Sequence, residues 1–305
     1  MYYLGVDLGG TNIKAALVDA DGAIIKEAST PTKLPRPAEA VCDDIAALCN
    51  QLAQGQQVAG IGVGCPGTVD GGLVRYSNNL DWHDFAMGDY LRAKTGLPVA
   101  LANDANAAAL GEALAGCAKG AESAVIITLG TGVGGGVIVN GKVIDGAHGA
   151  GGEIGHITVN PHETAVCGCG KRGCLEQYSS ATGVVRCMKK LLDANPDTAC
   201  TLRGKDFEAK DVFDAARAGD ALAAREVDEM ASTLGMALAN IAATTDPEMF
   251  MIGGGVARAG EVLFTPLVRH YKEYAFQSCK ETPIKAASLG NDAGIYGAVR
   301  LIVGA

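Results

Sequence analysis

The sequence lacks the features that mark membrane-spanning, secreted and nucleic-acid-binding proteins. No uninterrupted apolar stretch approaches the ~20 residues that cross a bilayer as a helix. The opening residues Met1–Asp7 have no basic segment, and Gly5 interrupts their apolar run, so we do not interpret them as a signal peptide. A formal net charge of −9 without a basic stripe argues against a nucleic-acid partner. We therefore expect a cytoplasmic protein that binds neither a membrane nor nucleic acid.

Two further patterns are missing. The cysteines outside residues 167–174 are scattered without a disulfide framework, as expected for reduced thiols in a cytosol. The P-loop pattern G-x-x-x-x-G-K-[ST] does not occur, which excludes a P-loop NTPase. What remains is a chain of 305 residues, 48% hydrophobic and 19% charged, which is long enough for two domains around two cores.

One histidine and three cysteines have the spacing of a metal-ligand set. Among loop-forming glycines they follow the pattern His156-x10-Cys167-x-Cys169-x4-Cys174. A zinc ion with four protein ligands has no open position for water, so the predicted zinc is structural. Residues 145–178 are therefore predicted to form a metal-pinned loop. His148 is an alternative fourth ligand.

Two carboxylates lie in this loop although the metal does not need them. Glu153 precedes the candidate histidine ligand, and Glu176 follows the last cysteine. A loop made rigid by a metal and bearing spare carboxylates indicates a binding surface. The alternative interpretation is that both are ordinary surface glutamates.

The chain opens with the signals of strands and tight turns. Strands are predicted at residues 2–8, 13–18 and 23–28, and they should pair antiparallel through short glycine turns. A helix should follow, because one helical face collects Val41, Ile45, Leu48 and Leu52. Later strands are expected near 58–63, 99–102, 137–139, 248–252 and 284–289, with a glycine- and asparagine-rich loop between the first two of them. Helices are expected beginning at 104, near 261–274 and 292–303, and from 179 on, where a buried stripe should comprise Met230, Leu234, Leu238 and Ile241.

A sequence pattern at the beginning of the chain is repeated near its middle. The two matching runs are Leu8-Gly9-Gly10-Thr11, followed by a strand and the turn Asp21-Gly22, and Leu129-Gly130-Thr131-Gly132, followed by a strand and the turn Asn140-Gly141. Two such units indicate duplicated halves with a nucleotide cleft between them. Residues 130–135 also satisfy G-x-G-x-x-G, but a strand follows instead of a helix, so we reject a dinucleotide site.

Both glycine loops can present backbone N–H groups to phosphate oxygens. Beside the first loop, Asp7 can hold a magnesium ion, Thr11 offers a hydroxyl group and Lys14 a cation. The run Gly253-Gly254-Gly255 after a predicted strand would let an adenine ring approach the backbone. Each glycine loop alone could equally be a tight turn.

Five motifs occur in order across essentially the whole chain. They are Asp7-Leu8-Gly9-Gly10-Thr11, Asn103-Asp104-Ala105-Asn106-Ala107, Leu129-Gly130-Thr131-Gly132, Gly152-Glu153-Ile154-Gly155-His156 and Cys167-Gly168-Cys169-Gly170-x-x-Gly173-Cys174-Leu175-Glu176. Together they resemble the ROK family of sugar kinases and repressors, and within it the bacterial glucokinases. The resemblance implies an α/β, actin-like ATPase (ribonuclease H-like) fold of two related domains with the active site in the cleft between them. The implied small domain comprises residues 1–115 plus 291–305, and the large domain residues 116–290.

The resemblance, with the glycine loops, also implies roles for individual residues. The expected sugar-binding residues are Gly67, Asn79, Asn103, Asp104, Glu153, His156 and Glu176, with Asp104 as the catalytic base. The expected ATP-binding residues are Asp7, Gly9, Gly10, Thr11, Lys14, Thr131, Gly132, Gly254 and Gly255. His156 would ligate zinc with one ring nitrogen and face the sugar with the other. The helix dipole should favour the ionised form of Asp104, and the alternative interpretation of this residue is a plain helix N-cap.

The chain also departs from the family pattern. No proline stands before Asn79, which leaves its sugar contact open, and Asn12 stands where relatives often have lysine, so Lys14 is the one cation expected near the phosphates. The expected reaction is Mg-ATP-dependent phosphorylation of a hexose, with glucose 6-phosphate formed from glucose, by a protein with structural zinc. Other acceptors stay open: mannose, fructose, allose, N-acetylmannosamine and N-acetylglucosamine. Polyphosphate is an alternative donor, a non-enzymatic sugar sensor is a remote alternative, and a homodimer is the expected assembly.

Overall fold

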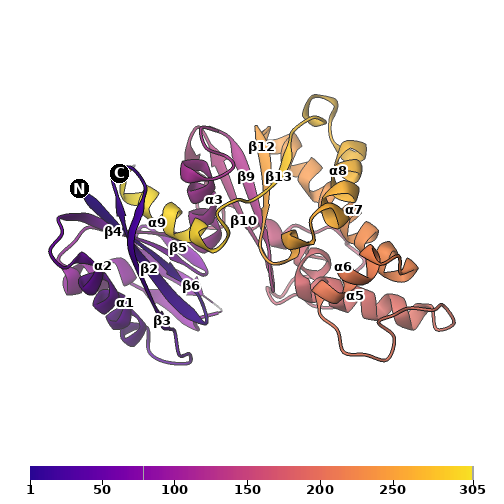
Figure 1. The fold of residues 1–305 in the computed structure, drawn as a ribbon, viewed down its shortest axis with the longest axis horizontal. Helices are drawn as coiled ribbons and strands as arrows, with labels where there is room; N and C mark the ends of the chain where they lie inside the picture. The colour runs from indigo at the N-terminus through magenta and orange to yellow at the C-terminus, as the bar shows by residue number, and fades with distance from the viewer. Residues whose placement is uncertain (78, 304–305) are drawn as a thin grey trace. The chain divides into compact units, whose positions relative to one another are not determined.

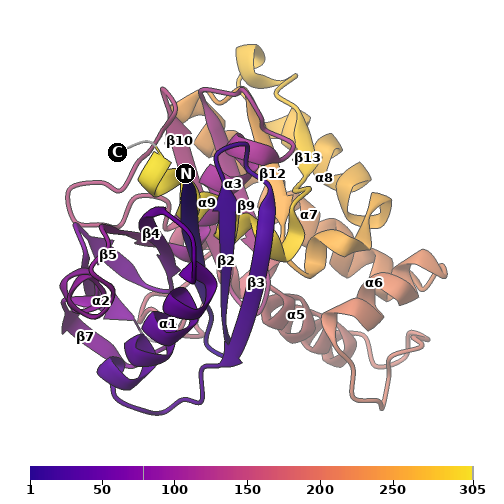
Figure 2. The same cartoon turned by 60° about the vertical axis from the view of Figure 1, so that its left-hand side comes forward.

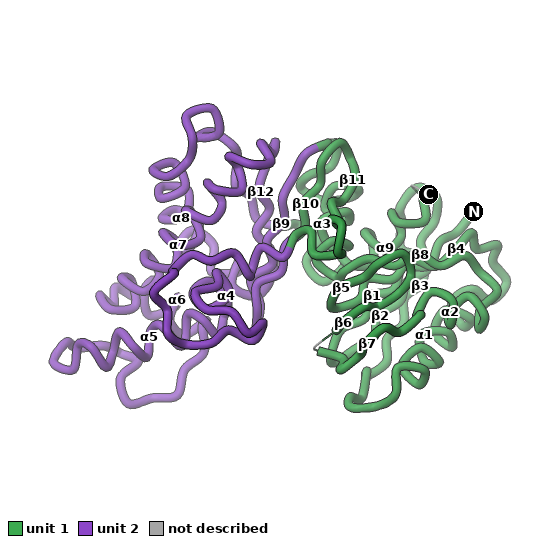
Figure 3. Tube along the Cα trace, turned by 180° about the vertical axis from the view of Figure 1, so that it is seen from behind, with its two compact units in different colours: residues 1–122, 136–152, 287–305 green, residues 123–135, 153–286 purple. Residues whose placement is uncertain are grey.

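The computed structural model describes residues 1–77 and 79–303. The chain forms two compact units, coloured separately in Figure 3. Unit 1 comprises residues 1–122, 136–152 and 287–305, and unit 2 comprises residues 123–135 and 153–286. The sequence analysis expected domain boundaries near 115 and 291; the units differ from that division mainly in that residues 136–152 group with unit 1.

Unit 1 is built on a five-stranded sheet with the order β3-β2-β1-β4-β8 (Figure 1). The strands are β1 (Tyr2–Leu8), β2 (Asn12–Asp19), β3 (Ile24–Pro31), β4 (Val58–Cys65) and β8 (Val99–Asn103). The first three pair antiparallel, whereas β4 lies parallel to both β1 and β8. The expected opening strands are therefore confirmed, and Figure 2 shows β2 and β3 running side by side as long neighbours.

Helices cover both faces of this sheet. On one face α1 (Ala38–Ala53) buries Val41, Ile45, Leu48 and Leu52 in a common core with Leu4, Val6 and Leu8 of β1. On the other face α9 (Ala293–Val303) packs on the sheet through Ile295 and Val299. Glycines let the helix backbone approach the strands, because a Cβ at Gly62 would lie 1.7 Å from the carbonyl oxygen of Ala298.

The segment between β4 and β8 contains more structure than the loop that the sequence analysis predicted. It forms a three-stranded antiparallel sheet from β5 (Thr68–Asp70), β6 (Leu73–Ser77) and β7 (Trp82–Phe85), followed by α2 (Met87–Thr95). These strands are short, and their exposed faces carry charged side chains such as Arg75 and Asp84. The expected alternation of apolar and polar residues is therefore too brief to recognise in the sequence.

Unit 2 contains a parallel core of three strands. β9 (Ala124–Leu129), β12 (Met249–Gly253) and β13 (Ile284–Ala286) pair in parallel, with β12 in the middle. The complete sheet has the order β11-β10-β9-β12-β13, and the chain passes from unit 2 to unit 1 within β10 (Val133–Val139). β10 and β11 (Lys142–Val143) form a hairpin whose turn residues Asn140 and Gly141 have positive φ, as the Asn-Gly pair predicts.

The remainder of unit 2 is mainly helical, as expected. Its helices are α4 (Glu176–Ser179), α5 (Ala181–Ala194), α6 (Ala209–Arg217), α7 (Ala221–Thr245) and α8 (Glu261–Tyr274). The predicted stripe of α7 is confirmed, because Met230, Leu234, Leu238 and Ile241 are all buried. None of the helices among the described residues combines the length and the apolar character that crossing a membrane requires. In unit 1, α3 (Asp104–Ala115) begins at the residue that the sequence analysis expected.

Candidate active site and metal centre

The first glycine loop connects β1 to β2 and is held by a residue that the sequence analysis missed. Thr32 is fully buried, and its hydroxyl group donates a hydrogen bond to the carbonyl oxygen of Gly9 at 2.7 Å. Its backbone N–H donates to the carbonyl oxygen of Thr11 at 2.8 Å. Gly10 and Thr11 themselves are exposed. Thr32 thus fixes the backbone of the loop, while Gly10 and Thr11 remain accessible to a ligand.

Asp7 lies near the end of β1, directly before this loop. The pKa of its carboxyl group is raised to about 6, first by burial and second by the negative charge of Asp104, against the opposing effect of Lys14. A Cβ at Gly294 would lie 2.8 Å from the carboxyl carbon of Asp7, so helix α9 must have glycine at this point. A buried carboxylate whose ionised form is disfavoured by a neighbouring carboxylate is the kind of group that attracts a divalent cation.

Lys14 projects from β2 and is already paired. Its ammonium group lies 2.6 Å from a carboxylate oxygen of Asp292 and 3.2 Å from one of Glu27. The hydrogen bond to Asp292 is the main reason that the pKa of Lys14 is raised. The sequence predicted this cation but neither of its acidic neighbours, which lie 13 and 278 residues away along the chain.

Asn103, not Asp104, is the N-cap of helix α3. The side-chain oxygen of Asn103 accepts hydrogen bonds from the backbone N–H groups of Ala105 and Asn106 at 2.9 and 3.3 Å. Its side-chain nitrogen donates to the carbonyl oxygen of Gly67 at 2.9 Å. The plain N-cap interpretation of Asp104 therefore does not apply, because its neighbour has that function.

The electrostatic expectation for Asp104 needs a correction. The sequence analysis expected the start of a helix to favour its ionised form. Burial instead raises the pKa of Asp104, and the backbone N–H of Ala105, 2.8 Å from the carboxylate, offsets this only in part. Desolvation outweighs the helix end here because the side chain is deeply enclosed. A carboxylate with a raised pKa is a better proton acceptor than an ordinary aspartate.

Two other expected sugar-side residues lie near the three-stranded sheet of unit 1. Gly67 has a φ of +102°, and a Cβ there would lie 2.2 Å from the carbonyl oxygen of Tyr76, so glycine is structurally required. Asn79 is exposed in the turn between β6 and β7. Unit 1 therefore contains Asn103, Asp104, Gly67 and Asn79. Hydrogen bonds fix the position of Asn103, and close packing fixes that of Gly67.

The second glycine loop, between β9 and β10, is held by Glu176. One carboxylate oxygen of Glu176 accepts a hydrogen bond from the backbone N–H of Val133 at 3.0 Å. A Cβ at Gly132 would lie 2.4 Å from the same oxygen, so a side chain at this position would displace the Glu176 carboxylate. The sequence analysis placed Glu176 on the sugar and Gly132 on the nucleotide, and it did not predict that they touch.

The start of α5 also supports this loop. The backbone N–H of Ala181 donates to the carbonyl oxygen of Gly130, and the hydroxyl group of Thr182 donates to that of Thr131, each at 2.8 Å. Together these contacts anchor the loop to the segment that follows the cysteines. No local sequence signal reveals them, because they join residues about fifty positions apart.

The third glycine run lies between β12 and a short 3-10 helix at Val256–Ala259. Gly254 has a φ of +84°, and a Cβ there would lie 2.4 Å from the carbonyl oxygen of Leu129. Gly254 is therefore required by the turn itself. Gly255 is exposed and faces open space, so a flat ligand can approach the backbone there.

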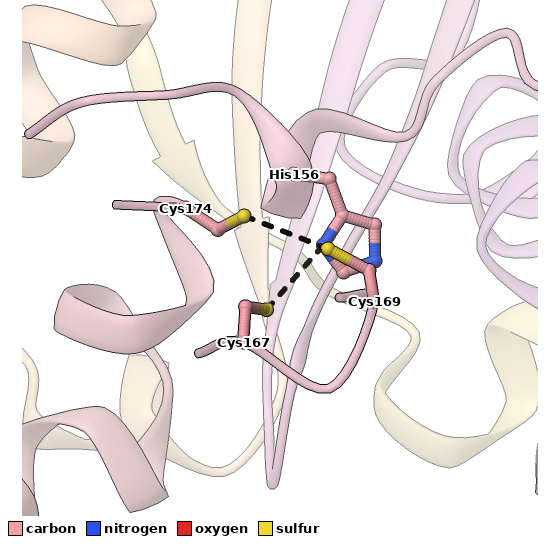
Figure 4. A group of neighbouring side chains, drawn as sticks. All are labelled: His156, Cys167, Cys169 and Cys174. Atoms are coloured by element: carbon pink, nitrogen blue, oxygen red, sulfur yellow. Dashed lines mark hydrogen bonds between the residues drawn. The ribbon is translucent and has the colours of Figure 1, made fainter. Parts of the chain in front are cut away.

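His156 and the three cysteines form one compact group (Figure 4). Their four ligand atoms all lie within 4.8 Å of one another, and among the described residues the group does not include His148. The Sγ atoms of Cys169 and Cys174 are 3.6 Å apart, and the Sγ of Cys167 lies 3.9 Å from Nδ1 of His156. Tetrahedral zinc with Zn–S bonds of about 2.3 Å requires sulfur atoms about 3.8 Å apart. The donor set and its spacing therefore fit a zinc ion.

Both spare carboxylates lie against this group. Nε2 of His156, the nitrogen that faces away from the cysteines, lies 3.8 Å from a carboxylate oxygen of Glu153. The Sγ of Cys167 lies 3.6 Å from the carboxylate oxygen of Glu176 that does not bind Val133. Nδ1 of His156 therefore lies toward the cysteines, and Nε2 lies toward Glu153.

A hydrogen-bond network that the sequence analysis did not predict supports the metal loop. The buried carboxylate of Glu163 accepts from Tyr178 at 2.8 Å and from Arg186 at 2.9 Å. The backbone N–H of Ala165 and the Arg186 guanidinium hold the pKa of Glu163 well below its usual range. Gln177 accepts from the N–H of Cys174 and donates to the carbonyl oxygen of Ala165. The part of the loop around Glu163 and Gln177 is therefore tied to α5 by side-chain contacts in addition to any metal.

Comparison with known proteins shows the family of this chain. The ROK family profile matches residues 3–304. A protein of Halalkalibacterium halodurans named glucokinase is 41% identical over 97% of this chain and 93% of its own length. A glucokinase of Thermotoga maritima is 40% identical over 98% of this chain and 96% of its own length.

A solved structure agrees. The ROK family glucokinase of Streptomyces griseus, crystallised with glucose and AMPPNP, is 37% identical, covers 100% of both chains and superposes with a TM-score of 0.82. This match confirms the actin-like ATPase fold that the sequence motifs implied. The sequence profile and the full-length relatives agree as well. The chain therefore belongs to the ROK family.

Proposed function

We propose that this protein transfers the terminal phosphoryl group of ATP to a hexose and that glucose is the acceptor. The observation that carries the proposal is the full-length similarity to proteins named glucokinase, one of them solved with glucose and AMPPNP. In this chain Asn103 is the N-cap of helix α3, so Asp104 does not have that function. AMPPNP is an analogue of ATP, which supports a nucleoside triphosphate as the donor. Some of the residues assigned to these roles lie in unit 1 and others in unit 2.

In this proposal Asp104 is the catalytic base. It accepts the proton of the attacking sugar hydroxyl group late in the transfer, because in the loose transition state the phosphoryl group is only weakly bonded to both the leaving and the attacking oxygen. Its raised pKa suits this role, and its position is defined by the cap that Asn103 forms on α3. Asn103 keeps one side-chain N–H beyond its bond to Gly67, and we assign that group to a sugar hydroxyl.

The remaining sugar contacts come from Gly67, Asn79 and the metal loop. Glu153 and Glu176 accept hydroxyl hydrogens, and His156 faces the sugar with Nε2 while Nδ1 points at the cysteines. Carboxylates that accept hydrogen bonds from a polyol contribute more than neutral acceptors, about 1.5–3 kcal/mol each. The Cys167, Cys169, Cys174 and His156 group would hold zinc as a structural ion that keeps these side chains in place.

The nucleotide is assigned to the three glycine runs. Backbone N–H groups near Gly9, Gly10 and Thr11, and near Thr131 and Gly132, donate to phosphate oxygens, and the adenine lies against Gly254 and Gly255. Asp7 would hold magnesium, which neutralises phosphate charge when bound. Lys14 shares its charge between its acidic neighbours and the phosphates.

A coupled assay tests the proposal. Purified protein with Mg-ATP is offered glucose, mannose, fructose, allose, N-acetylmannosamine and N-acetylglucosamine, with polyphosphate as the competing donor, and ADP release and the phosphorylated position are measured. We expect the highest kcat/KM with glucose and ATP, at the 6-hydroxyl group. Asp104→Asn should lower kcat by ~10²–10⁴-fold with little effect on glucose binding. Fast turnover of another sugar, or none of any sugar, would refute the assignment.

Two coarser proposals accompany the activity. We propose a cytoplasmic location, supported by ten free cysteines, which an oxidising compartment does not favour. We also propose a homodimer, the most frequent assembly of soluble homo-oligomers, which light scattering of the purified chain would test.

A further inference from the structure

A buried carboxylate on helix α3 holds two distant segments of the chain. Glu112 is fully buried. One of its oxygens accepts from the backbone N–H groups of Ser288 and Leu289, each at 2.7 Å. The other accepts from the backbone N–H of Cys117 at 2.9 Å and from the hydroxyl group of Ser288 at 3.0 Å. Four donors thus meet a single side chain.

These two segments are the places where the chain leaves unit 1 for the first time and returns to it for the last time. Residues 116–122 lead to the boundary at 122/123, and residues 287–289 follow the boundary at 286/287. Figure 3 shows these crossings as changes of colour along the trace. One carboxylate therefore ties both connections to the same point of α3.

The fit around this carboxylate is close. A Cβ at Gly116 would lie 1.9 Å from the Glu112 oxygen that binds Cys117, so only glycine leaves room for the carboxylate there. An isolated buried carboxylate is strongly unfavourable, and here its acceptor sites are filled by hydrogen-bond donors. An apolar side chain could fill the same space but could not orient the three backbone N–H groups.

Helix α3 is itself immobilised in unit 1. A Cβ at Gly297 would lie 1.5 Å from the carbonyl oxygen of Ala107, and one at Gly111 would lie 2.1 Å from that of Ala293, so α3 and α9 touch through their backbones. The first residue of the same helix is Asp104. The residue assigned as catalytic base and the anchor of both connections therefore share one rigid element.

We propose that Glu112 is a positioning residue that couples hexose binding to nucleotide binding, an inference that rests on the proposed function. The residues assigned to the two ligands divide between the units, so the chain connections between the units are a route by which a ligand bound to one unit can affect the other. Glu112 holds two of those connections in a defined orientation relative to Asp104. Without it the connections adopt more conformations, and each unit binds its share of the ligands with less influence on the other.

Calorimetry of the full-length, zinc-loaded protein tests this coupling. The Kd for glucose is measured with and without Mg-AMPPNP, in the native chain and in Glu112→Gln. The amide oxygen still accepts from Ser288 and Leu289, whereas the amide nitrogen cannot accept from Cys117. We expect the ratio of the two Kd values to differ from one by about fivefold or more in the native chain and to approach one in the variant.

Two controls separate positioning from simple loss of stability. Ile45→Val removes a methyl group from the unit 1 core on the face of the sheet that α1 covers, opposite α9; it should lower the Tm and leave the Kd ratio unchanged. Hydrogen exchange should be faster in Glu112→Gln at the amide of Cys117 than at those of Ser288 and Leu289. This measurement shows that the intended bond has been removed.

The outcomes distinguish this inference from the proposed function. A native chain that binds no hexose refutes the proposed function. A native chain that phosphorylates glucose but has a Kd ratio of one refutes only the role of Glu112. The same holds if the variant frees the Cys117 amide and keeps the native ratio, because Glu112 would then be a purely structural residue.

Discussion

The two glycine loops look alike in sequence, but they are held in different ways. The loop of unit 1 is held by a hydrogen bond from Thr32, which follows β3 of the same sheet. Two charged side chains flank this loop in the sequence, Asp7 before it and Lys14 after it. The loop of unit 2 is held by the start of α5 and by Glu176, whose other oxygen lies against a cysteine of the metal group. The first loop is thus shaped by its own neighbourhood, and the second by the metal loop.

Under the proposed assignments, this difference implies that a structural metal would act on the nucleotide side as well as on the sugar side. Glu176 stands between the metal group and the backbone of Val133, so a change in one is transmitted to the other. Loss of the metal should therefore impair both substrates, whereas changes around the first loop should impair ATP alone. The following predictions test this contrast, beginning with the largest expected effect.

Cys169→Ser should remove zinc and activity together. The variant loses one of four ligands, and the loop that carries Glu153, His156 and Glu176 loses its fixed geometry. Several charged hydrogen bonds of about 1.5–3 kcal/mol each are involved, so kcat/KM should fall by more than ~100-fold for glucose and for ATP. Zinc content by atomic absorption and steady-state kinetics measure both effects. A metal-free variant of native activity would contradict the contrast between the loops.

Acidification should weaken magnesium at the first loop. The pKa of Asp7 in the folded protein is raised to about 6, above its ordinary value of 3.8, so below pH 6 a proton competes with the metal. Apparent magnesium affinity should fall by about tenfold per pH unit below this point. Magnesium titrations of activity between pH 7.5 and about 5 measure the slope.

The raised pKa of Asp7 also affects the free energy of unfolding, which acidification should increase although it weakens magnesium binding. The folded state holds the proton of Asp7 more tightly than the unfolded state, so its contribution opposes folding increasingly as pH rises from about 4 to 6. Asp7→Asn should remove this slope from the pH dependence of Tm measured without magnesium. A variant with the native slope would show that Asp7 is not the titrating group.

Glu176→Ala should raise KM for glucose and for ATP, each by roughly tenfold, with the fold intact. It removes a sugar acceptor and also the acceptor of the Val133 N–H, a charge-assisted hydrogen bond. The matched control is Glu153→Ala, whose carboxylate lies beside His156 and should affect KM for glucose only. Equal effects of the two substitutions on ATP would argue against transmission through Glu176.

Thr32→Val should have the smallest effect. It keeps the shape of the side chain and removes the hydrogen bond to Gly9, which is worth about 0.5–1.5 kcal/mol. KM for ATP should rise by a few-fold, and KM for glucose should stay unchanged. Kinetics at saturating concentrations of each fixed substrate measure both constants. A larger effect on glucose than on ATP would break the proposed independence of the first loop.

Local patterns predicted much of the fold. The opening hairpins, the helix stripes of α1 and α7 and the start of α3 all follow from the period of apolar residues and from turn glycines. The sheet of β5, β6 and β7 was wrongly expected to be a loop, because strands of three to five residues with charged outer faces leave little alternation. Their stability comes from packing on the rest of unit 1.

For Asp104 the sequence correctly indicated the helix start but led to the wrong electrostatic expectation. The start of a helix favours a carboxylate, yet enclosure of the side chain raises its pKa. Burial is a property of everything that surrounds a residue, and motif spacing contains no measure of it. The roles of the other site residues remain predictions for the experiments above.

The sequence alone predicted three cysteines with metal-ligand spacing, the glycine turns and the order of most strands and helices, because each depends on residues that are close along the chain; the structure then placed His156 with these cysteines. Only the tertiary structure decided which side chains hold the loops: Thr32 under the first, Glu176 beside the second and Glu112 between the connections. These contacts join segments between 20 and 180 residues apart. They exist because packing brings buried donors to acceptors, which no local pattern can specify.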